Sequence, residues 1–268
     1  MTRRIMLGFG IFTLILMPAG FADAQGGQWG TVKGRITWGG PDIPKQLPVA
    51  AVANSPDKMA CMKDGHVVLD EKWVVNPKNK GLKWTFVWLA NENVKNKEPL
   101  PTHPDLKALK QEKVVMDEPL CAFLPHAIAL REGQVLVAKN SATISHNFKW
   151  TGNPTTANAG NNVLIAPGNA IDIKGLVADE RWPVKIECNI HPWMNGWVRI
   201  FNHPYYAVTD ADGAFEFKNA PAGTYRLMVY HGSGGWLGGA AGRTGRLITI
   251  KPGGTLDLGS LAYPPPPE

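Results

Sequence analysis

Three residues with metal-binding side chains lie close together near the start of the last third of the chain. Cys188, His191 and Met194 form a Cys-x2-His-x2-Met pattern. The alternating segment 184–187 precedes them, and the apolar segment 196–200 follows, so a loop between two β-strands is predicted to carry all three. This loop presents a thiolate, an imidazole and a thioether, which together bind soft transition-metal ions.

These ligand types are typical of a mononuclear type 1 copper site, where two imidazoles and a thiolate lie in one plane with a long axial thioether. The soft sulfur ligands favour Cu(I), and the imidazoles also suit Cu(II). The loop supplies only one histidine, and His146, which follows Asn140 and Ser141, is the candidate for the second. The pattern predicts one copper ion that cycles between Cu(II) and Cu(I). We therefore expect an electron carrier that is not itself an enzyme.

Each ligand candidate also has a simpler interpretation. Cys188 alone would be a buried thiol, His191 a turn histidine and Met194 a core side chain. Their joint spacing, together with His146 and Asn147 upstream, favours copper over these separate roles. The other histidines lack such neighbours, and we expect them in packing or surface roles: His66, His103, His126, His203 and His231.

Residues 1–24 have the pattern of a secretory signal peptide. Arg3 and Arg4 precede a short apolar stretch, and the sequence Ala-Asp-Ala at 22–24 resembles a cleavage site. We expect cleavage after Ala24 and a periplasmic or secreted protein without a membrane anchor, exported by the general route or by the twin-arginine route. An uncleaved N-terminal anchor is the alternative.

The charge of the chain indicates which partners it can bind, and its cysteine content indicates whether it can form a disulfide. Without residues 1–24, 26 of the 28 basic and 21 of the 22 acidic residues remain. The sequence has no cluster of Lys and Arg of the kind that binds the phosphates of nucleic acids. We therefore expect no nucleic-acid partner, and we expect a monomer. Pairing Cys61 with Cys121 would form a disulfide and leave Cys188 free, although either of the two could instead be a buried thiol.

The composition predicts an all-β chain, because 29 Gly, 22 Pro and ten Trp indicate many short strands and turns. Residues 25–110 form an N-terminal β segment, with strands at 31–38, 72–76 and 82–89 and a linker at 95–110. Residues 111–202 form a compact unit of short strands, and residues 203–263 form a third section. The Pro-rich tail at 264–268 is expected to be extended.

The third section resembles the prealbumin-like sandwich that occurs beside carboxypeptidases. Its D-x-x-G-x-F-x-F pattern begins at Asp210, and its P-x-G-x-Y-x-L pattern begins at Pro221. Residues 30–36 resemble the first strand of that family, G-x-V-x-G-x-V. The resemblance implies that residues 111–202 are inserted into a sandwich made from both chain ends, and a tandem arrangement is the alternative.

Residues 111–202 resemble the cupredoxins. Residues 133–141 and 145–147 are similar to the strand that delivers the first histidine, and residues 188–194 have the short loop spacing of amicyanin, including Pro192. The resemblance implies a Greek-key sandwich in which His146, Cys188 and His191 are equatorial ligands and Met194 is axial. With its flanking β segments, the chain is also similar to methylamine-utilisation-like plastocyanin proteins.

The resemblance also assigns roles around the ligands. It implies that Asn147 braces the two ligand loops by hydrogen bonds. It implies that His191 reaches the surface in an apolar patch, with Pro192 and Trp193, where a redox protein partner docks and the electron leaves. Trp193 is bulkier than many residues in such loops and could shield this histidine.

Two departures exclude multi-copper enzymes. Val184 occupies the position four residues before Cys188, so the second thiolate of a binuclear copper centre is absent. No His-x-His pair occurs in the sequence, which argues against a multicopper oxidase. The alternatives to an electron carrier are a protein that captures or delivers copper, and a structural surface protein with a vestigial site.

Overall fold

The computed structural model of the chain describes residues 28–179 and 183–265. The predicted signal peptide at residues 1–24 lies outside the described residues, as do positions 266–268 of the Pro-rich tail. The predicted all-β class is confirmed, because two β-sandwiches contain nearly all of the regular structure. Within the described ranges, no helix is long and apolar enough to cross a membrane.

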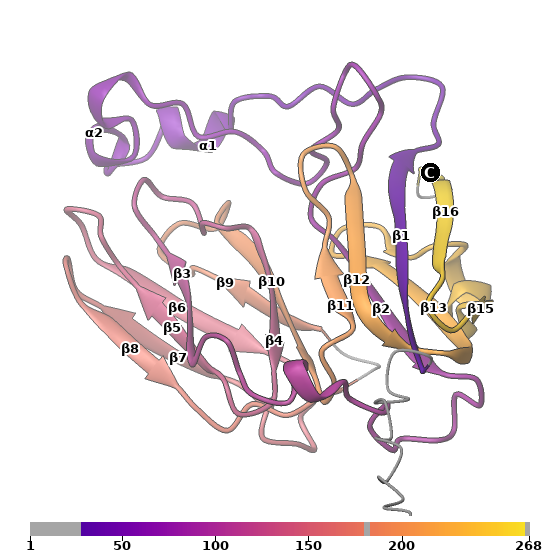
Figure 1. Cartoon of the computed structure of the whole chain (residues 1–268). Coiled ribbons are helices and arrows are strands. Elements are labelled where there is room, and N and C mark those ends of the chain that lie inside the picture. Colours follow the sequence, from indigo (N-terminus) through magenta and orange to yellow (C-terminus); the bar gives the residue numbers. More distant parts are fainter. Residues whose placement is uncertain (1–27, 180–182, 266–268) are drawn as a thin grey trace, which may run out of the picture.

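The middle of the chain forms the first sandwich (Figure 1). Apolar and polar side chains alternate along its strands, so one face of each sheet is buried, as in β9, where Val184 and Ile186 are fully buried. The larger sheet has the order β4 (Ala127–Arg131), β10 (Asn195–Phe201), β9 (Val184–Glu187), β6 (His146–Thr151) and β7 (Asn161–Ile165). The smaller sheet has the order β3 (Lys113–Asp117), β5 (Val135–Lys139) and β8 (Ala170–Ile173).

The second sandwich is built from both ends of the chain (Figure 1). Its first strand pairs antiparallel with β12 and parallel with β16, so N-terminal and C-terminal segments share one sheet. That sheet has the order β12 (Ala214–Pro221), β1 (Trp29–Trp38) and β16 (Thr255–Tyr263). The other has the order β11 (Tyr206–Val208), β2 (Thr85–Asn91), β13 (Gly223–His231) and β14 (Gly235–Trp236), and β15 (Arg246–Ile250) also pairs with β13.

The first sandwich is thus nested between strands of the second, and an apolar interface joins the two. Phe86, Trp88 and Met228 of the second sandwich pack with Ala127 and Phe201 of the first in one buried cluster. The guanidinium of the buried Arg199 lies 4.1 Å from the centre of the Trp88 ring, where the electron-rich face of the ring attracts a cation.

Two predicted strands of the N-terminal segment need correction. Residues 72–76 form no continuous strand, and Val75 makes only an isolated bridge to Leu82. The strand expected from residue 82 begins at Thr85, because Trp84 has a φ of 64°, which no extended strand accommodates. A short 3₁₀ helix, η3 (Pro104–Leu106), lies within the expected linker.

Residues 47–70, called here the lid segment, lie over the first sandwich although they precede it by more than forty positions (Figure 1). The lid segment contains two short helices, α1 (Ala50–Ala53) and α2 (Lys58–Cys61), and the turn η2 (Lys63–Gly65). A β-bridge between Pro48 and Leu69 closes its two ends. Val52, Cys61 and Val68 are buried in the same core cluster as the strands of the first sandwich.

Candidate metal centre

Strand pairing brings the predicted ligands together. β6 begins at His146 and runs antiparallel to β9, with Lys149 opposite Glu187, so the start of β6 lies beside the end of β9. Cys188 directly follows β9. β9 and β10 also pair, with Asn195 opposite Glu187, so residues 188–194 form the connecting loop of a hairpin.

The thiol and the two imidazoles converge on one point. Nδ1 of His146 lies 3.0 Å from Nδ1 of His191, and each of these nitrogens lies 3.9 Å from Sγ of Cys188. Metal–nitrogen bonds of about 2.0 Å and metal–thiolate bonds of about 2.3 Å place such donors about 3–4 Å apart around one first-row ion. The spacing therefore fits a single metal ion bound by both Nδ1 atoms and the thiolate.

The fourth predicted ligand, Met194, ends the same loop. Its backbone N–H donates to the carbonyl of His191 at 2.8 Å, and its own carbonyl accepts from the N–H of Cys188 at 3.3 Å. Its side chain is 2% exposed and belongs to the same buried cluster as Cys188. The loop of the hairpin thus carries Cys188, His191 and Met194, and all three are buried.

Asn147 links the two segments that carry the ligands. Its Oδ1 accepts from the backbone N–H groups of Asn189 at 2.8 Å and Ile190 at 3.1 Å, and it lies 3.5 Å from Sγ of Cys188. Its Nδ2 donates to Oδ1 of Asn162 on β7 at 2.6 Å. One side chain on β6 therefore holds the turn after Cys188 against the strand that begins at His146.

Burial sets the protonation of the metal-free site. Desolvation raises the pKa of the Cys188 thiol above its ordinary value. Desolvation, followed by the neighbouring His191, lowers the pKa of His146 to about 4. At neutral pH the site therefore holds a neutral imidazole at His146 and a protonated thiol, and metal binding has to displace the thiol proton.

The expectation that His191 reaches the surface is wrong for this structure. Its side chain is 1% exposed, and Nε2 lies 3.0 Å from Oδ2 of Asp57 in the lid segment. The lid segment covers the edge of the ring that the cupredoxin resemblance places at the surface. Of the two residues predicted for docking, Pro192 is exposed, and Trp193 is half-buried, with its ring centre 5.1 Å from that of His191.

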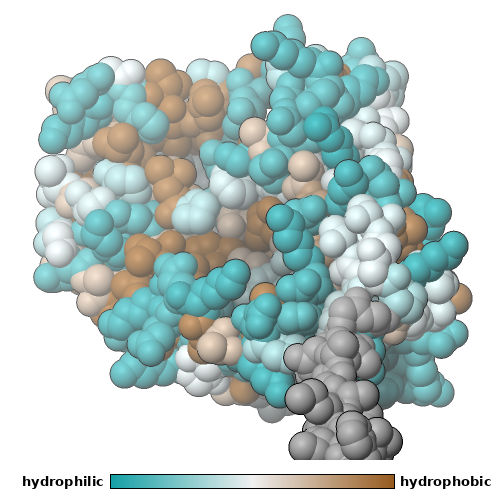
Figure 2. Space-filling view, viewed as in Figure 1, coloured by the Kyte–Doolittle hydropathy of each residue, from teal (hydrophilic) through white to brown (hydrophobic). Residues whose placement is uncertain are grey.

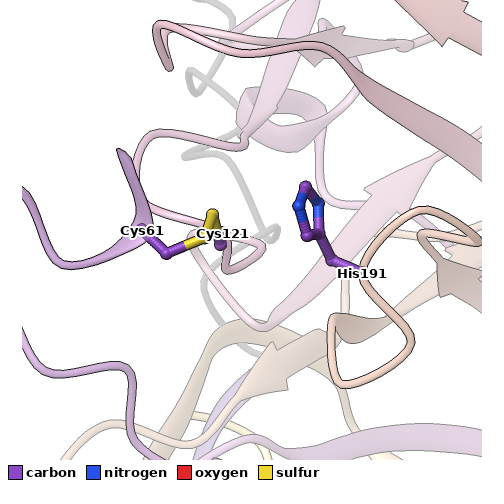
Figure 3. A group of neighbouring side chains, drawn as sticks. All are labelled: Cys61, Cys121 and His191. Carbon is purple, nitrogen blue, oxygen red and sulfur yellow. A yellow bond between two sulfur atoms is a disulfide. The ribbon is translucent and has the colours of Figure 1, made fainter. Parts of the chain in front are cut away.

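A disulfide joins the lid segment to the first sandwich. Cys61 and Cys121 are bonded, and both are fully buried. Figure 3 shows the disulfide facing the imidazole of His191, and both sulfur atoms lie within 4.8 Å of a ring nitrogen. The bonded sulfurs offer no thiolate, so Cys188 is the free cysteine and the thiolate candidate for the site.

Two residues near the site were missed by the sequence interpretation. Asp57 had no direct sequence signal, because only the fold places Cys121, the disulfide partner of Cys61, beside the ligand loop. Glu118 had no sequence signal. Its side chain is fully buried, and neither carboxyl oxygen has a hydrogen-bond partner within the described ranges.

The buried carboxyl group of Glu118 should make the free energy of unfolding depend on pH. Desolvation, followed by the charge of Asp117, raises the pKa of Glu118 from 4.5 to about 8. The folded chain therefore holds a proton that the unfolded chain releases, and this contribution to the free energy of unfolding is complete below pH 4.5 and is lost as the pH rises to about 8. At about 1.4 kcal/mol for each pKa unit, the effect is on the order of a few kcal/mol.

We expect Glu118→Gln to remove this loss, so that the metal-free variant gains stability over the wild type as the pH rises from 5 to 8. Urea unfolding of both proteins at several pH values measures the difference. Glu112→Gln, at an exposed position of the same region, is the control and should follow the wild type. If the free energy of unfolding changed with pH in the same way in the wild type and in Glu118→Gln, the raised pKa of Glu118 would be contradicted.

Comparisons with known proteins give structural neighbours only. No family model matches the chain, and no curated protein matches it. Among solved structures, a reduced amicyanin variant is 15% identical with a TM-score of 0.30 and covers 42% of this chain and 97% of its own. Amicyanin from Paracoccus versutus is 17% identical with a TM-score of 0.29 and covers 42% and 96%.

A purple cupredoxin from Nitrosopumilus maritimus is 15% identical with a TM-score of 0.27, and it covers 32% of this chain and 97% of its own. At these values the likeness carries no argument about function. We therefore infer the function from the side chains of this chain and the distances between them.

Proposed function

We propose that this protein is an exported one-electron carrier that holds one copper ion through His146, Cys188, His191 and Met194. The observation that carries the proposal is the convergence of a free buried thiol and two Nδ1 atoms at 3.0–3.9 Å. Bound copper would supply the one-electron couple between Cu(II) and Cu(I).

The residues of the chain would provide ligands for both oxidation states of the copper ion and hold them in place. Two imidazoles suit Cu(II), and the two sulfur ligands suit Cu(I), so one donor set serves both oxidation states. Hydrogen bonds from the loop to Asn147 and the packing of the paired strands hold the donors in place, and burial excludes water from them. A fixed, dry donor set needs little rearrangement when an electron enters or leaves.

Because the lid segment covers His191, an electron would have to reach a partner by another path. A cleft of about 480 Å³ lies between the lid segment and the ligand loop, and Leu69, Pro192, Trp193 and Met194 contribute to its walls. We propose that the redox partner docks here and that the Trp193 ring, which contacts both His191 and the cleft, carries the electron outward.

The surface around the lid segment is apolar enough for such docking. Figure 2 shows apolar side chains gathered in the half of the view that holds the first sandwich and the lid segment. The lid segment exposes five large apolar side chains: Leu47, Met59, Met62, Val67 and Leu69. Apolar side chains gathered on one exposed face mark a site for interaction with another protein.

Copper titration followed by visible absorption tests the proposal. One equivalent of Cu(II) should give a strong thiolate-to-copper band at about 600 nm and a reversible one-electron couple. A protein that binds copper tightly and stays colourless would refute the assignment. A site that binds no copper at all would refute it as well.

Copper capture or delivery is the second candidate function, and the covered His191 favours it. A donor set whose four residues are all buried suits retention of an ion more than rapid exchange of electrons. The electron self-exchange rate decides between the two. Rapid self-exchange of the loaded protein supports the electron carrier, and slow self-exchange with transfer of copper to an apo acceptor supports delivery.

Substitution of the axial candidate makes a further prediction. Met194→Gln should retain copper but lower the reduction potential, because an amide oxygen is a harder ligand than a thioether and favours Cu(II). Cyclic voltammetry measures the change. Met59→Gln, at a methionine that is 79% exposed on the lid segment, is the control and should keep the wild-type potential. An unchanged potential in Met194→Gln would exclude Met194 as a ligand.

A further inference from the structure

We infer that Asp57 is a positioning residue of the metal centre, and that it acts from the lid segment through a hydrogen bond to Nε2 of His191. The inference rests on the proposed copper site and assigns a role outside its four ligands. Asp57 lies 134 positions before His191 in the sequence, in a segment that belongs to neither strand of the ligand hairpin.

The orientation of the His191 ring fixes the direction of this hydrogen bond. Nδ1 faces His146 and Cys188 at 3.0 and 3.9 Å, so the metal-binding lone pair has to lie on Nδ1. The ring proton then lies on Nε2, and Nε2–H donates to Oδ2 of Asp57 at 3.0 Å. A carboxylate in this position selects the tautomer that can bind the metal and holds the plane of the ring.

The lid segment holds Asp57 in place by several contacts. The backbone N–H of Asp57 donates to Oγ of Ser55 at 3.1 Å, and its carbonyl accepts from the N–H groups of Ala60 at 2.9 Å and Cys61 at 3.1 Å. Cys61 is in turn bonded to Cys121 beside the ligand loop. The carboxylate is therefore held four residues from a covalent anchor, with Val52 packed into the core on the other side.

The charge of Asp57 has a consequence that its geometry alone would not have. A carboxylate next to a histidine ligand raises the basicity of that ligand and stabilises the more highly charged metal ion. Asp57 should therefore favour Cu(II) over Cu(I) and lower the reduction potential. A residue that only closed the site would leave the potential unchanged.

Two substitutions separate position from charge. Asp57→Asn keeps an oxygen that can accept from Nε2–H but removes the charge, whereas Asp57→Ala removes both. Asp64→Asn is the matched control. Asp64 is an exposed acidic residue of the same segment with a φ of 55°, a conformation that asparagine also tolerates, so the control removes the same charge without touching His191.

The reduction potential of the copper-loaded full chain is the first measurement. We expect Asp57→Asn to keep one bound copper ion, with the ratio of Cu(I) to Cu(II) affinity raised roughly tenfold, which is about 59 mV for a one-electron couple. Asp57→Ala should show the same shift and lose roughly 10–100-fold in Cu(II) affinity. Asp64→Asn should change neither. Wild-type potentials in both Asp57 variants would overturn the inference.

Nitrogen-15 NMR of the metal-free protein is the second measurement, and it does not depend on copper. The wild type should show His191 as the Nε2–H tautomer, and Asp57→Ala should show a mixture of tautomers. An unchanged tautomer in Asp57→Ala would overturn the inference. If the wild type failed to form a coloured copper site, the proposed function would fail, whereas a coloured site with no response to Asp57 would remove this inference alone.

Discussion

Replacing Cys188 with serine should abolish the visible colour of the copper-loaded protein. The band at about 600 nm arises from charge transfer between a thiolate and Cu(II), and a serine hydroxyl provides no such donor. The substitution changes one atom at a fully buried position, so the fold should persist. Visible absorption and copper content of the loaded variant measure the effect, and a band that survived would refute the ligand set.

Asn189→Ala is the matched control for this substitution. Asn189 is the next residue of the same loop, and its interaction with Asn147 is made by the backbone N–H, which alanine keeps. The control should therefore retain the band. If it lost the band to the same extent as Cys188→Ser, disturbance of the loop would explain the loss better than removal of a ligand.

The convergence of the candidate ligands His146, Cys188 and His191 could be predicted from the sequence because its information is local. Cys188, His191 and Met194 share one hairpin loop, and alternation in the segment before them predicts β9 correctly. The β-strand that begins at His146 is also predicted from the residues of one short segment. Such a pattern can be recognised in the sequence because alternate residues of one strand lie on the same face of the sheet.

The cover over the site could not be predicted, because it depends on contacts between distant residues. Nothing near Asp57 in the sequence indicates that it lies against His191, and the disulfide predicted between Cys61 and Cys121, which the structure contains, does not by itself place Cys121 beside the ligand loop. The cupredoxin resemblance covers residues 111–202 and contains no counterpart of the lid segment. It therefore predicted an exposed His191 where the structure has a buried one.

Local backbone conformation accounts for the missed strand boundary. The residues from 82 to 89 alternate and predict one strand, but the positive φ of Trp84 delays its start to Thr85. Trp84 lies between the bridge that Leu82 makes to Val75 and the first residue of β2, so this local connection sets its conformation against the strand preference of tryptophan.

Removing the disulfide should both destabilise the protein and open its metal centre. In the double variant Cys61→Ser and Cys121→Ser, a crosslink across 60 positions is lost, which costs about 4 kcal/mol in the chain-entropy account. Without this bond, the lid segment is held to the first sandwich by the hydrogen bond between Asp57 and His191 and by a few apolar side chains, so it should detach more often. We expect copper transfer to a strong chelator to be at least about tenfold faster, in line with a local opening equilibrium shifted by more than about 1.4 kcal/mol.

A second variant distinguishes local opening from general loss of stability. Leu227→Ala creates a cavity in the core of the second sandwich and should cost about 2–5 kcal/mol without touching the lid segment. It should release copper at nearly the wild-type rate under native conditions, although its urea midpoint falls. Equal acceleration in both variants would mean that copper escapes by global unfolding. Acceleration in the disulfide variant alone would mean that the lid segment retains the metal, because the variant removes a covalent anchor four residues from the carboxylate that covers His191.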